Sequence, residues 1–228
     1  MAPEERGQPV RLDRERILDA ASAIVGTEGL PALTMRRIGA ELGADPTAVY
    51  RHFRNKRELL SELAARLFAT EPELDPQTTW QERLRAVLDH GLKRYRAHLD
   101  LGLLLAGQPD DLPGLVQIRE RTLELLVEAG LDLARAAPMS QVLENHVVGC
   151  GLFFAVSGWN GEAAETEADL AARRDAFAVV SPAVAPLSRE AAPYLFPDPD
   201  VAYAQATEML FAEIERIAAE STEEVACP

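Results

Sequence analysis

The sequence predicts an all-α protein with a small N-terminal domain and a larger helical C-terminal domain. Apolar residues recur at helical spacing in successive segments of the 228-residue chain, and no segment alternates apolar and polar residues long enough to form a strand. Residues that cap or end helices bound these segments. Charge divides the chain as well. Residues 1–60 carry 10 Lys and Arg against 9 Asp and Glu, whereas the remainder carries 13 against 28, so the first sixty residues are compositionally distinct.

The composition excludes several classes of protein. Hydrophobic residues make up 47% of the chain and charged residues 26%, which is ordinary for a globular protein with a real core. No run of about 18 uncharged apolar residues is present, so we expect no membrane span, and the polar N-terminus does not resemble a secretory signal. Cys150 and Cys227 are too few for a disulfide framework or a zinc site of their own. We therefore expect a cytoplasmic protein without a metal or cofactor.

The first two helices are expected at about residues 11–26 and at residues 34–42. Asp13 and Thr34 are suitable N-cap residues, because their side chains accept hydrogen bonds from the first free backbone N–H groups. Gly43 follows the second helix, where a left-handed residue ends a helix without Cβ strain. The residues expected to face inward are Ile17, Ala21, Ile24, Val25, Met35, Ile38 and Leu42.

Two more helices follow in the N-terminal region. Asp45 is an N-cap candidate and Pro46 suits the first position of a helix at 46–53. Asn55, with Glu58 three residues later, resembles a capping box at the start of the fourth helix. The inward-facing residues expected here are Val49, Phe53, Leu59, Leu60, Leu63 and Leu67.

The C-terminal region is expected to hold longer helices. The Pro-containing stretch 71–76 is predicted to be a linker or loop. Residues 158–197 are predicted to form a long mobile loop with one short helix near 169–178. Asp198-Pro199 begins a final helix that frays after about Ala219. The other helices are expected at about 79–99, 101–107, 113–129 and 140–158. The domains are accordingly a disordered tail (1–10), a helix-turn-helix domain (11–57), a ligand-binding and dimerisation domain (58–220) and a C-terminal tail (221–228).

Residues 34–56 satisfy the requirements of a helix-turn-helix. Two short helices are separated by a short turn that contains Gly, and the second exposes small, polar and aromatic side chains. A tight helical hairpin inside a bundle is the structural alternative, and the Arg clusters alone would fit a solvated helix face. A core hairpin would not expose Tyr50, Arg51 and His52 together beside further Arg residues, which favours a DNA-reading surface.

These residues also resemble a known family. Residues 34–44, TMRRIGAELGA, and residues 47–60, TAVYRHFRNKRELL, are similar to the two motifs of the N-terminal domain of tetracycline-repressor (TetR) family regulators, and the resemblance covers 11–68. Gly39 and Ala40 depart from the pattern, where Ala and a polar residue are more usual. Beyond this domain only the helix layout matches, with a weaker similarity to the tetracycline-repressor-like C-terminal subclass around 123–129 and 146–154.

The resemblance implies roles for individual residues. Arg36 is a candidate for reading a base edge, because guanine is the commonest arginine target. Tyr50, His52 and Lys56 match phosphate-holding positions, and Thr34 caps a helix whose N-terminus faces a phosphate. Specificity is expected from Arg36, Thr47, Ala48 and Arg51, since phosphate contacts only fix the register. The full set of expected DNA-binding residues is Thr34, Arg36, Arg37, Pro46, Thr47, Ala48, Tyr50, Arg51, His52 and Lys56.

A homodimer follows from the same resemblance. The helices at about 140–158 and 198–218 would pair with their symmetry mates in a four-helix interface, where Gly149 and Gly151 permit close backbone approach. The alternative is that both helices belong to the internal core of one chain.

A small-molecule effector would bind among the helices between about 60 and 158. Leu104 occupies the position at which the tetracycline repressor has a metal-binding histidine, so the expected effector is a small, largely apolar molecule and not a metal-chelated tetracycline. Taken singly, each pocket candidate also fits a satisfied core residue or an exposed side chain. The candidates are Trp80, Tyr95, His98, Gln108, Arg121, Asn145, His146, Phe154 and Trp159.

The predicted function is therefore a ligand-responsive DNA-binding regulator, a repressor released from a palindromic operator of double-stranded DNA by its effector. The alternative is a ligand-independent DNA-binding regulator or architectural factor controlled by a partner protein. An enzyme is disfavoured, and no catalytic residues are assigned, because the chain holds no Gly-x-Ser-x-Gly elbow, phosphate-binding glycine loop, His-Glu-x-x-His or Cys-x-x-Cys motif.

Overall fold

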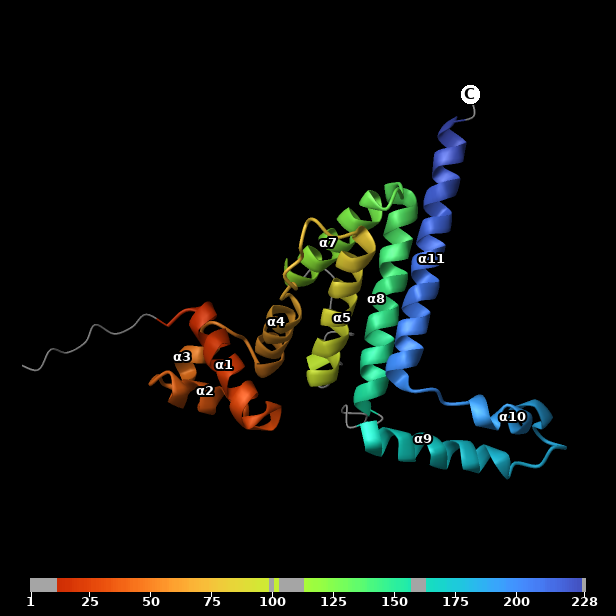
Figure 1. Ribbon diagram of the computed structural model, residues 1–228. Helices are drawn as coiled ribbons and strands as arrows, with labels where there is room; N and C mark the ends of the chain where they lie inside the picture. The colour runs from red at the N-terminus through yellow and green to blue at the C-terminus, as the bar shows by residue number, and fades with distance from the viewer. Residues whose placement is uncertain (1–11, 99–100, 103–112, 157–162, 227–228) are drawn as a thin grey trace, which may run out of the picture. The chain divides into compact units, whose positions relative to one another are not determined.

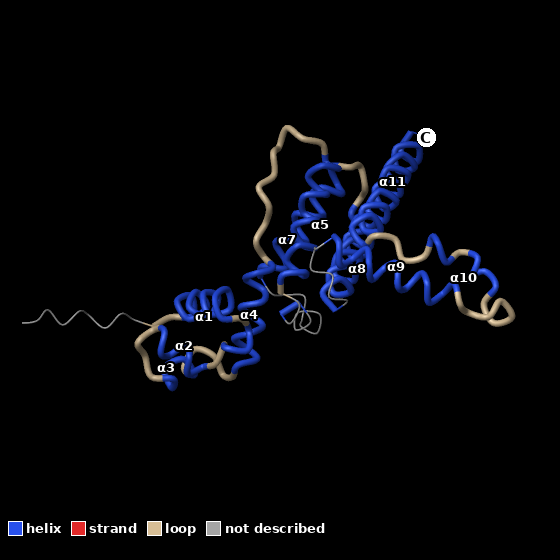
Figure 2. Tube along the Cα trace, turned by 60° about the horizontal axis from the view of Figure 1, so that its bottom comes forward, coloured by secondary structure: helices blue, strands red, loops and turns tan. Residues whose placement is uncertain are grey.

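The computed structural model describes residues 12–98, 101–102, 113–156 and 163–226, and every regular element among them is a helix (Figures 1 and 2). Contacts divide these residues into two compact units, and the division falls after Thr70. Residues 101–102 and 113–115 group with the first unit, and the rest of the chain from Glu71 belongs to the second. The expected all-α class is confirmed. No helix in the described ranges combines the length and apolarity that a membrane crossing needs.

Among the described residues up to Thr70, four α-helices pack around one apolar core. The core is formed by Ile17, Leu18, Ala20, Ala21, Ile24, Leu33, Met35, Ile38, Val49, Phe53, Leu59 and Leu63. Leu59 and Leu63 tie the fourth helix to this core, so the compact unit extends beyond the boundary expected after Arg57. The elements are α1 (Arg14–Glu28), the 3₁₀ helix η1 (Leu30–Ala32), α2 (Met35–Glu41), α3 (Pro46–Tyr50) and α4 (Lys56–Phe68).

The four predicted N-caps of this unit are confirmed. The side chains of Asp13, Thr34, Asp45 and Asn55 accept backbone N–H bonds at 2.8–3.0 Å from residues two or three positions later. The predicted capping box is only half formed, because the Glu58 carboxylate accepts the backbone N–H of Arg54 (2.7 Å) in place of that of Asn55. The carboxylate thereby stabilises the turn that enters α4.

The turn between α2 and α3 depends on two glycines. Gly43 has φ 61°, the left-handed conformation expected of it. Gly39 lies where a Cβ atom would meet the backbone oxygen of Ala44 at 2.9 Å, so the departure from the family pattern has a steric reason here. The third helix is shorter than predicted: α3 ends at Tyr50, and Arg51 and His52 form a turn.

The second unit is built around α5, α7, α8 and α11, with α8 packed against both α5 and α11 (Figure 1). Gly151 of α8 lies so close to α5 that a Cβ atom would stand 2.3 Å from the Cβ of Tyr95. This glycine therefore serves packing within one chain, whereas the sequence suggested a contact between chains. The elements are α5 (Trp80–Ala97), α7 (Pro113–Glu128), α8 (Leu133–Val156), α9 (Ala163–Ala178), α10 (Pro186–Glu190), η2 (Ala192–Tyr194) and α11 (Pro199–Ala226).

Two predicted helices of this unit are longer in the structure. The helix expected at 140–158 begins at Leu133 and runs through Pro138, because Asp132 caps the backbone N–H of Arg135 (2.9 Å) and Ala136 is buried. The final helix does not fray after Ala219 but continues to Ala226. The helix expected at 101–107 lies mostly outside the described residues; Leu101 and Gly102 are helical.

The loop expected at 158–197 is largely helical from Ala163 onward. Helix α9 begins at Ala163, and α10 and η2 fold back against it (Figure 2). Arg174 donates hydrogen bonds to the backbone oxygens of Leu195 (3.1 Å) and Phe196 (3.0 Å). The ring of Phe177 lies 5.3 Å from that of Phe196. These contacts join segments about twenty residues apart, which a local helical pattern does not reveal.

Candidate DNA-reading surface and effector site

Helix α3 is anchored by two buried side chains and presents the others outward. Val49 and Phe53 have no exposed surface, and they hold the helix against the core of the first unit. Tyr50 is 52% exposed, and Thr47 and Arg51 are also exposed. Pro46, Ala48 and His52, the remaining expected contacts of this segment, are half-buried.

The first turn of α2 contributes a second part of this surface. The Thr34 side chain caps the helix by accepting the backbone N–H of Arg37 (3.0 Å). Thr34 and Arg36 are both exposed. In the described part of the chain no carboxylate lies within ion-pair distance of Arg36 or Arg51. Lys56, at the start of α4, is likewise exposed. These cations are available to phosphates or base edges.

Arg37 differs from these cations, because two carboxylates already hold it. Its guanidinium lies 2.6 Å from Glu28 and 2.7 Å from Glu41. These hydrogen-bonded partners raise the pKa of Arg37 and neutralise its charge locally. The structure gives this residue a role in joining α1 to α2, which the sequence pattern did not suggest.

Thr47 is held by the cap of its own helix. Its hydroxyl donates to the Asp45 carboxylate (2.6 Å), which also accepts the backbone N–H of Thr47 (2.8 Å). These two bonds lower the pKa of Asp45, so the carboxylate is charged at neutral pH. With its proton engaged by Asp45, the exposed Thr47 hydroxyl is left as a hydrogen-bond acceptor.

Two exposed cations of the same region were not among the predicted contacts. Arg54 and Arg57 are exposed between the end of α3 and the first turn of α4, and Arg54 is 91% exposed. In the sequence, only their charge and their place in the run from Arg51 to Arg57 indicated that they could contact DNA.

The candidate effector residues lie in several environments. Trp80 packs against Phe211 with ring centres 5.7 Å apart, and Phe154 is buried beneath Arg96, whose guanidinium carbon lies 4.3 Å from the ring centre. Burial raises the pKa of Tyr95 to about 12. These side chains belong to or border the core of the second unit.

His146 joins α8 to α11. Its Nε2 lies 3.1 Å from the hydroxyl of Thr207, its Nδ1 lies 3.7 Å from the Cys150 sulfur, and its ring stacks on Tyr203 at 4.9 Å. Burial lowers its pKa, which favours the neutral imidazole. The Tyr203 hydroxyl is buried without a hydrogen-bond partner among the described atoms, so this polar cluster is not fully satisfied.

Of the other candidates that the structure describes, Asn145 is exposed, whereas Arg121 and His98 are half-buried. Arg121 pairs with Glu71 (3.5 Å) and Glu124 (2.6 Å). His98 ends α5, and burial lowers its pKa. Gln108 and Trp159 lie outside the described residues, as does Leu104. Within the described ranges, no three His, Cys, Asp or Glu side chains are grouped so as to hold a metal ion.

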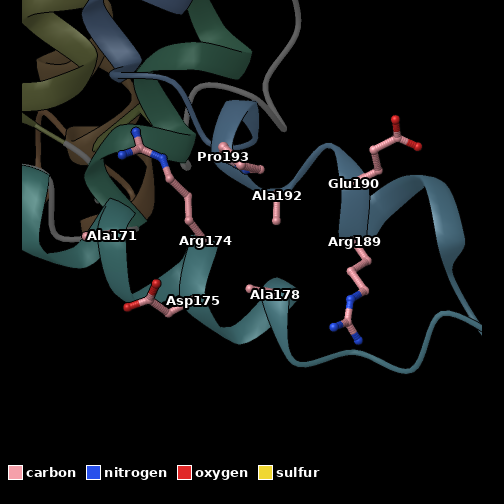
Figure 3. A pocket seen from close by; sticks show the side chains of 8 residues that line it. All are labelled: Ala171, Arg174, Asp175, Ala178, Arg189, Glu190, Ala192 and Pro193. Atoms are coloured by element: carbon pink, nitrogen blue, oxygen red, sulfur yellow. The ribbon is translucent and has the colours of Figure 1, made fainter.

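A pocket of about 430 Å³ lies where α9 faces α10 and η2 (Figure 3). None of the predicted effector residues that the structure describes lines it. Four small apolar residues and four charged residues line it, and the Arg174 guanidinium is already bound to backbone oxygens. The lining residues are Ala171, Arg174, Asp175, Ala178, Arg189, Glu190, Ala192 and Pro193.

Comparison with known families matches both units. Residues 17–63 match bacterial regulatory proteins of the tetR family, and residues 71–216 match the tetracyclin repressor-like C-terminal domain. The two matched ranges meet near the division that the contacts place after Thr70.

Curated relatives are similar over part of their length. The HTH-type transcriptional repressor DrrR1 of Streptomyces coeruleorubidus is 30% identical over 148 residues, which cover 63% of this chain and 54% of the relative. The class D tetracycline repressor protein of Escherichia coli is 31% identical over 131 residues, which cover 54% of this chain and 57% of the relative. The chain thus spans little more than half the length of these relatives.

Solved structures share the fold over nearly the whole chain. Apo ActR of Streptomyces coelicolor superposes with a TM-score of 0.74 at 24% identity, covering 94% of this chain and 99% of ActR. The complex of ActR with actinorhodin gives a TM-score of 0.74 at 24% identity, covering 92% of this chain and 99% of that one.

Proposed function

Because the chain belongs to the tetR family of bacterial regulatory proteins, we propose that it is a ligand-responsive transcriptional repressor that binds operator DNA as a homodimer in the cytoplasm. The observation that carries this proposal is the surface of α2 and α3, where Arg36, Thr47, Tyr50 and Arg51 are exposed together. A surface with unpaired cations and small side chains suits the major groove of DNA. Release of the operator by a small molecule would end repression, and no enzymatic step is needed.

The DNA contacts divide into two kinds. Arg36, Thr47, Ala48 and Arg51 read base edges, while Tyr50, His52 and Lys56 hold phosphates together with the N-terminus of α2 capped by Thr34. Arg37 contributes less than the sequence suggested, because binding a phosphate would require it to leave Glu28 and Glu41. Arg54 and Arg57 supply additional phosphate contacts.

A triple variant tests DNA binding. We expect Arg36→Glu/Thr47→Glu/Arg51→Glu to lose operator affinity by more than about a thousandfold, because it removes base contacts and sets new carboxylates against phosphates. The measurement is fluorescence anisotropy with a duplex selected by the wild-type protein from a random pool. The control is Lys93→Glu/Gln117→Glu/Arg173→Glu, in the second unit, which changes the net charge equally. Unchanged operator binding by the first variant would overturn the proposed reading surface.

The effector is proposed to bind among the helices of the second unit, near Trp80, Tyr95, His146 and Phe154. The other contacts that the sequence suggested stay proposals too, and they are His98, Gln108, Arg121, Asn145 and Trp159. The aromatic side chains and the incompletely satisfied polar group near His146 suit a largely apolar molecule with a few hydrogen-bonding groups.

An extract titration tests the sensor role. Metabolite extracts from the source cells are added to the protein–operator complex, and we expect a fraction that releases the DNA and also quenches tryptophan fluorescence. Trp80→Phe should reduce that quenching, because Trp80 is one of only two tryptophans in the chain. A complex that no extract dissociates would argue for a regulator controlled by a partner protein.

A further inference from the structure

Arg14, at the start of α1, contacts both the segment after α3 and helix α4. One terminal nitrogen donates to the backbone oxygen of His52 (2.5 Å). The other terminal nitrogen and Nε reach Glu58 (3.3 Å) and Glu62 (3.3 Å) on α4. The guanidinium carbon lies 4.3 Å from the ring centre of Phe53, which is fully buried.

These partners surround the end of the reading helix. His52 and Phe53 lie two and three residues beyond the end of α3, which has only five residues. A helix of that length has no stability of its own, so its orientation is set by tertiary contacts. Val49 anchors its inner face, Phe53 anchors the segment after it, and the Arg14 bond to the His52 oxygen fixes the backbone between them.

The guanidinium is suited to this task. Its donors point in fixed directions within one plane, so it satisfies a carbonyl and two carboxylates only while all three keep their relative positions. A lysine offers a point charge without these fixed directions. The contacts therefore fix the position of the end of α3 relative to α1 and α4.

We propose that Arg14 is a positioning residue for DNA reading, which holds the segment from Tyr50 to Phe53 in the arrangement that fits a specific operator. This inference rests on the proposed DNA-binding function. Arg14 need not touch DNA; it acts through the His52 backbone and the Phe53 ring. Without it, the exposed side chains of α3 remain present but sample more than one arrangement, so specific binding suffers more than non-specific binding.

The chain offers a matched control in Arg66. This arginine also joins α4 to α1 through two carboxylates, Glu15 (3.5 Å) and Asp19 (2.5 Å). Its side chain is 42% exposed, the same value as for Arg14. None of its recorded contacts involves residues 46–53, so it shares the role of joining the helices without the link to the reading helix.

The experiment compares Arg14→Gln, Arg14→Lys and Arg66→Gln with the wild-type full-length chain. For each, anisotropy gives the affinity for a duplex selected by the wild type and for a scrambled duplex of equal length, and thermal unfolding reports stability. We expect the specific-to-scrambled ratio to fall about tenfold or more in Arg14→Gln. A smaller fall is expected in Arg14→Lys and none in Arg66→Gln, although both glutamine variants lose a similar amount of thermal stability.

The outcomes separate this inference from the function on which it rests. An unchanged ratio in Arg14→Gln, or in a folded Arg14→Lys if the glutamine variant does not fold, overturns the positioning role while DNA binding stands. An equal fall in Arg66→Gln overturns it too, because the α1–α4 connection alone would then be responsible. If the wild type selects no duplex, the proposed DNA-binding function fails, and the inference fails with it.

Discussion

At the scale of single residues, two arginines and one glycine show how strongly local environment decides a role. Arg36 and Arg37 are adjacent residues of the same type, but only Arg37 forms ion pairs with two carboxylates. The charge of Arg37 is therefore compensated within the protein, and that of Arg36 is available to a ligand. The sequence pattern alone placed both among the expected DNA-binding residues. Gly39 departs from the usual family residue, and the backbone oxygen of Ala44 explains why.

Gly39→Ala is therefore expected to destabilise the first unit. The added Cβ would meet a backbone oxygen at 2.9 Å, and a backbone atom can move away only if the turn before α3 shifts. Overpacking of this kind costs about 1–3 kcal/mol, more than the roughly 0.5–1 kcal/mol that alanine gains over glycine in a helix. Thermal or urea unfolding measures the change.

Gly26→Ala is the matched control. Gly26 also lies within a helix, but nothing surrounds the position of its Cβ within 4 Å. The expected result is a stability gain of up to about 1 kcal/mol. Similar effects of the two substitutions would show that the close approach at Gly39 is unimportant.

At the scale of elements, the start of α4 connects the helices of the first unit. The Glu58 carboxylate accepts the backbone N–H of Arg54 and binds Arg14, so it stabilises the turn after α3 and links α4 to α1. These contacts favour the charged form and lower the pKa of Glu58. The capping pattern at Asn55 predicted the helix start but not this second partner.

The pH dependence of stability tests this role. Because the pKa of Glu58 is lower in the folded than in the unfolded chain, its contribution is fully present above the ordinary value of 4.5 and is lost as pH falls through the folded value. Glu58→Gln should thus destabilise the protein at pH 7, and the difference from wild type should shrink below about pH 4.5. Thermal unfolding between pH 7 and pH 3 measures it. Glu73→Gln, which removes an exposed loop carboxylate, is the control, and its stability should stay close to that of the wild type across this pH range.

Helices α8 and α11 show how burial and exposure coexist on one element. The inner faces of these helices form the core of the second unit with α5, while several large apolar side chains remain uncovered in the isolated chain. The internal-core interpretation of the sequence thus holds for the inner faces, whereas the interface interpretation stays a prediction for the outer faces. The exposed residues are Leu133, Val142 and Phe153 on α8, and Val201 and Met209 on α11.

At the scale of the whole molecule, these uncovered faces support the proposed homodimer. Pairing α8 and α11 with their symmetry mates would bury Val142 and Met209, which are 44% and 74% exposed. A Cβ atom at Gly149 of α8 would meet nothing within 4 Å, so a partner backbone has room to approach there. A symmetric dimer would present two reading surfaces to a palindromic operator, as helix-turn-helix regulators require.

Met209→Glu is expected to shift the protein toward monomer. A carboxylate at the centre of an apolar interface loses its hydration without gaining a partner, which weakens association by roughly tenfold or more. Sedimentation velocity at micromolar concentration measures the shift, and operator affinity should fall in parallel. Val179→Glu is the control, because Val179 is 81% exposed but follows α9, outside the proposed interface. Dimers of unchanged stability in the Met209 variant would show that α11 does not form the contact.

The helices, their caps and the outward-facing side chains after Asp45 could be predicted because they depend on neighbours along the chain. Spacings of two to four residues along the chain determine the apolar faces of α1, α2 and α4 and the N-cap at each helix start. They also determine which side chains of α3 face outward. The same spacings carry the resemblance to the family. For these features the amino-acid sequence alone was sufficient.

Other features depend on contacts between distant segments, and only the tertiary structure decided them. Arg174 holds the segment after η2 against α9, Gly151 lies against Tyr95, and Arg14 reaches from α1 to His52 and α4. Each contact joins residues more than twenty positions apart, and its energy arises only once the chain has brought them together. Local periodicity carries no information about such pairs, because the spacing along the chain does not fix the distance in space.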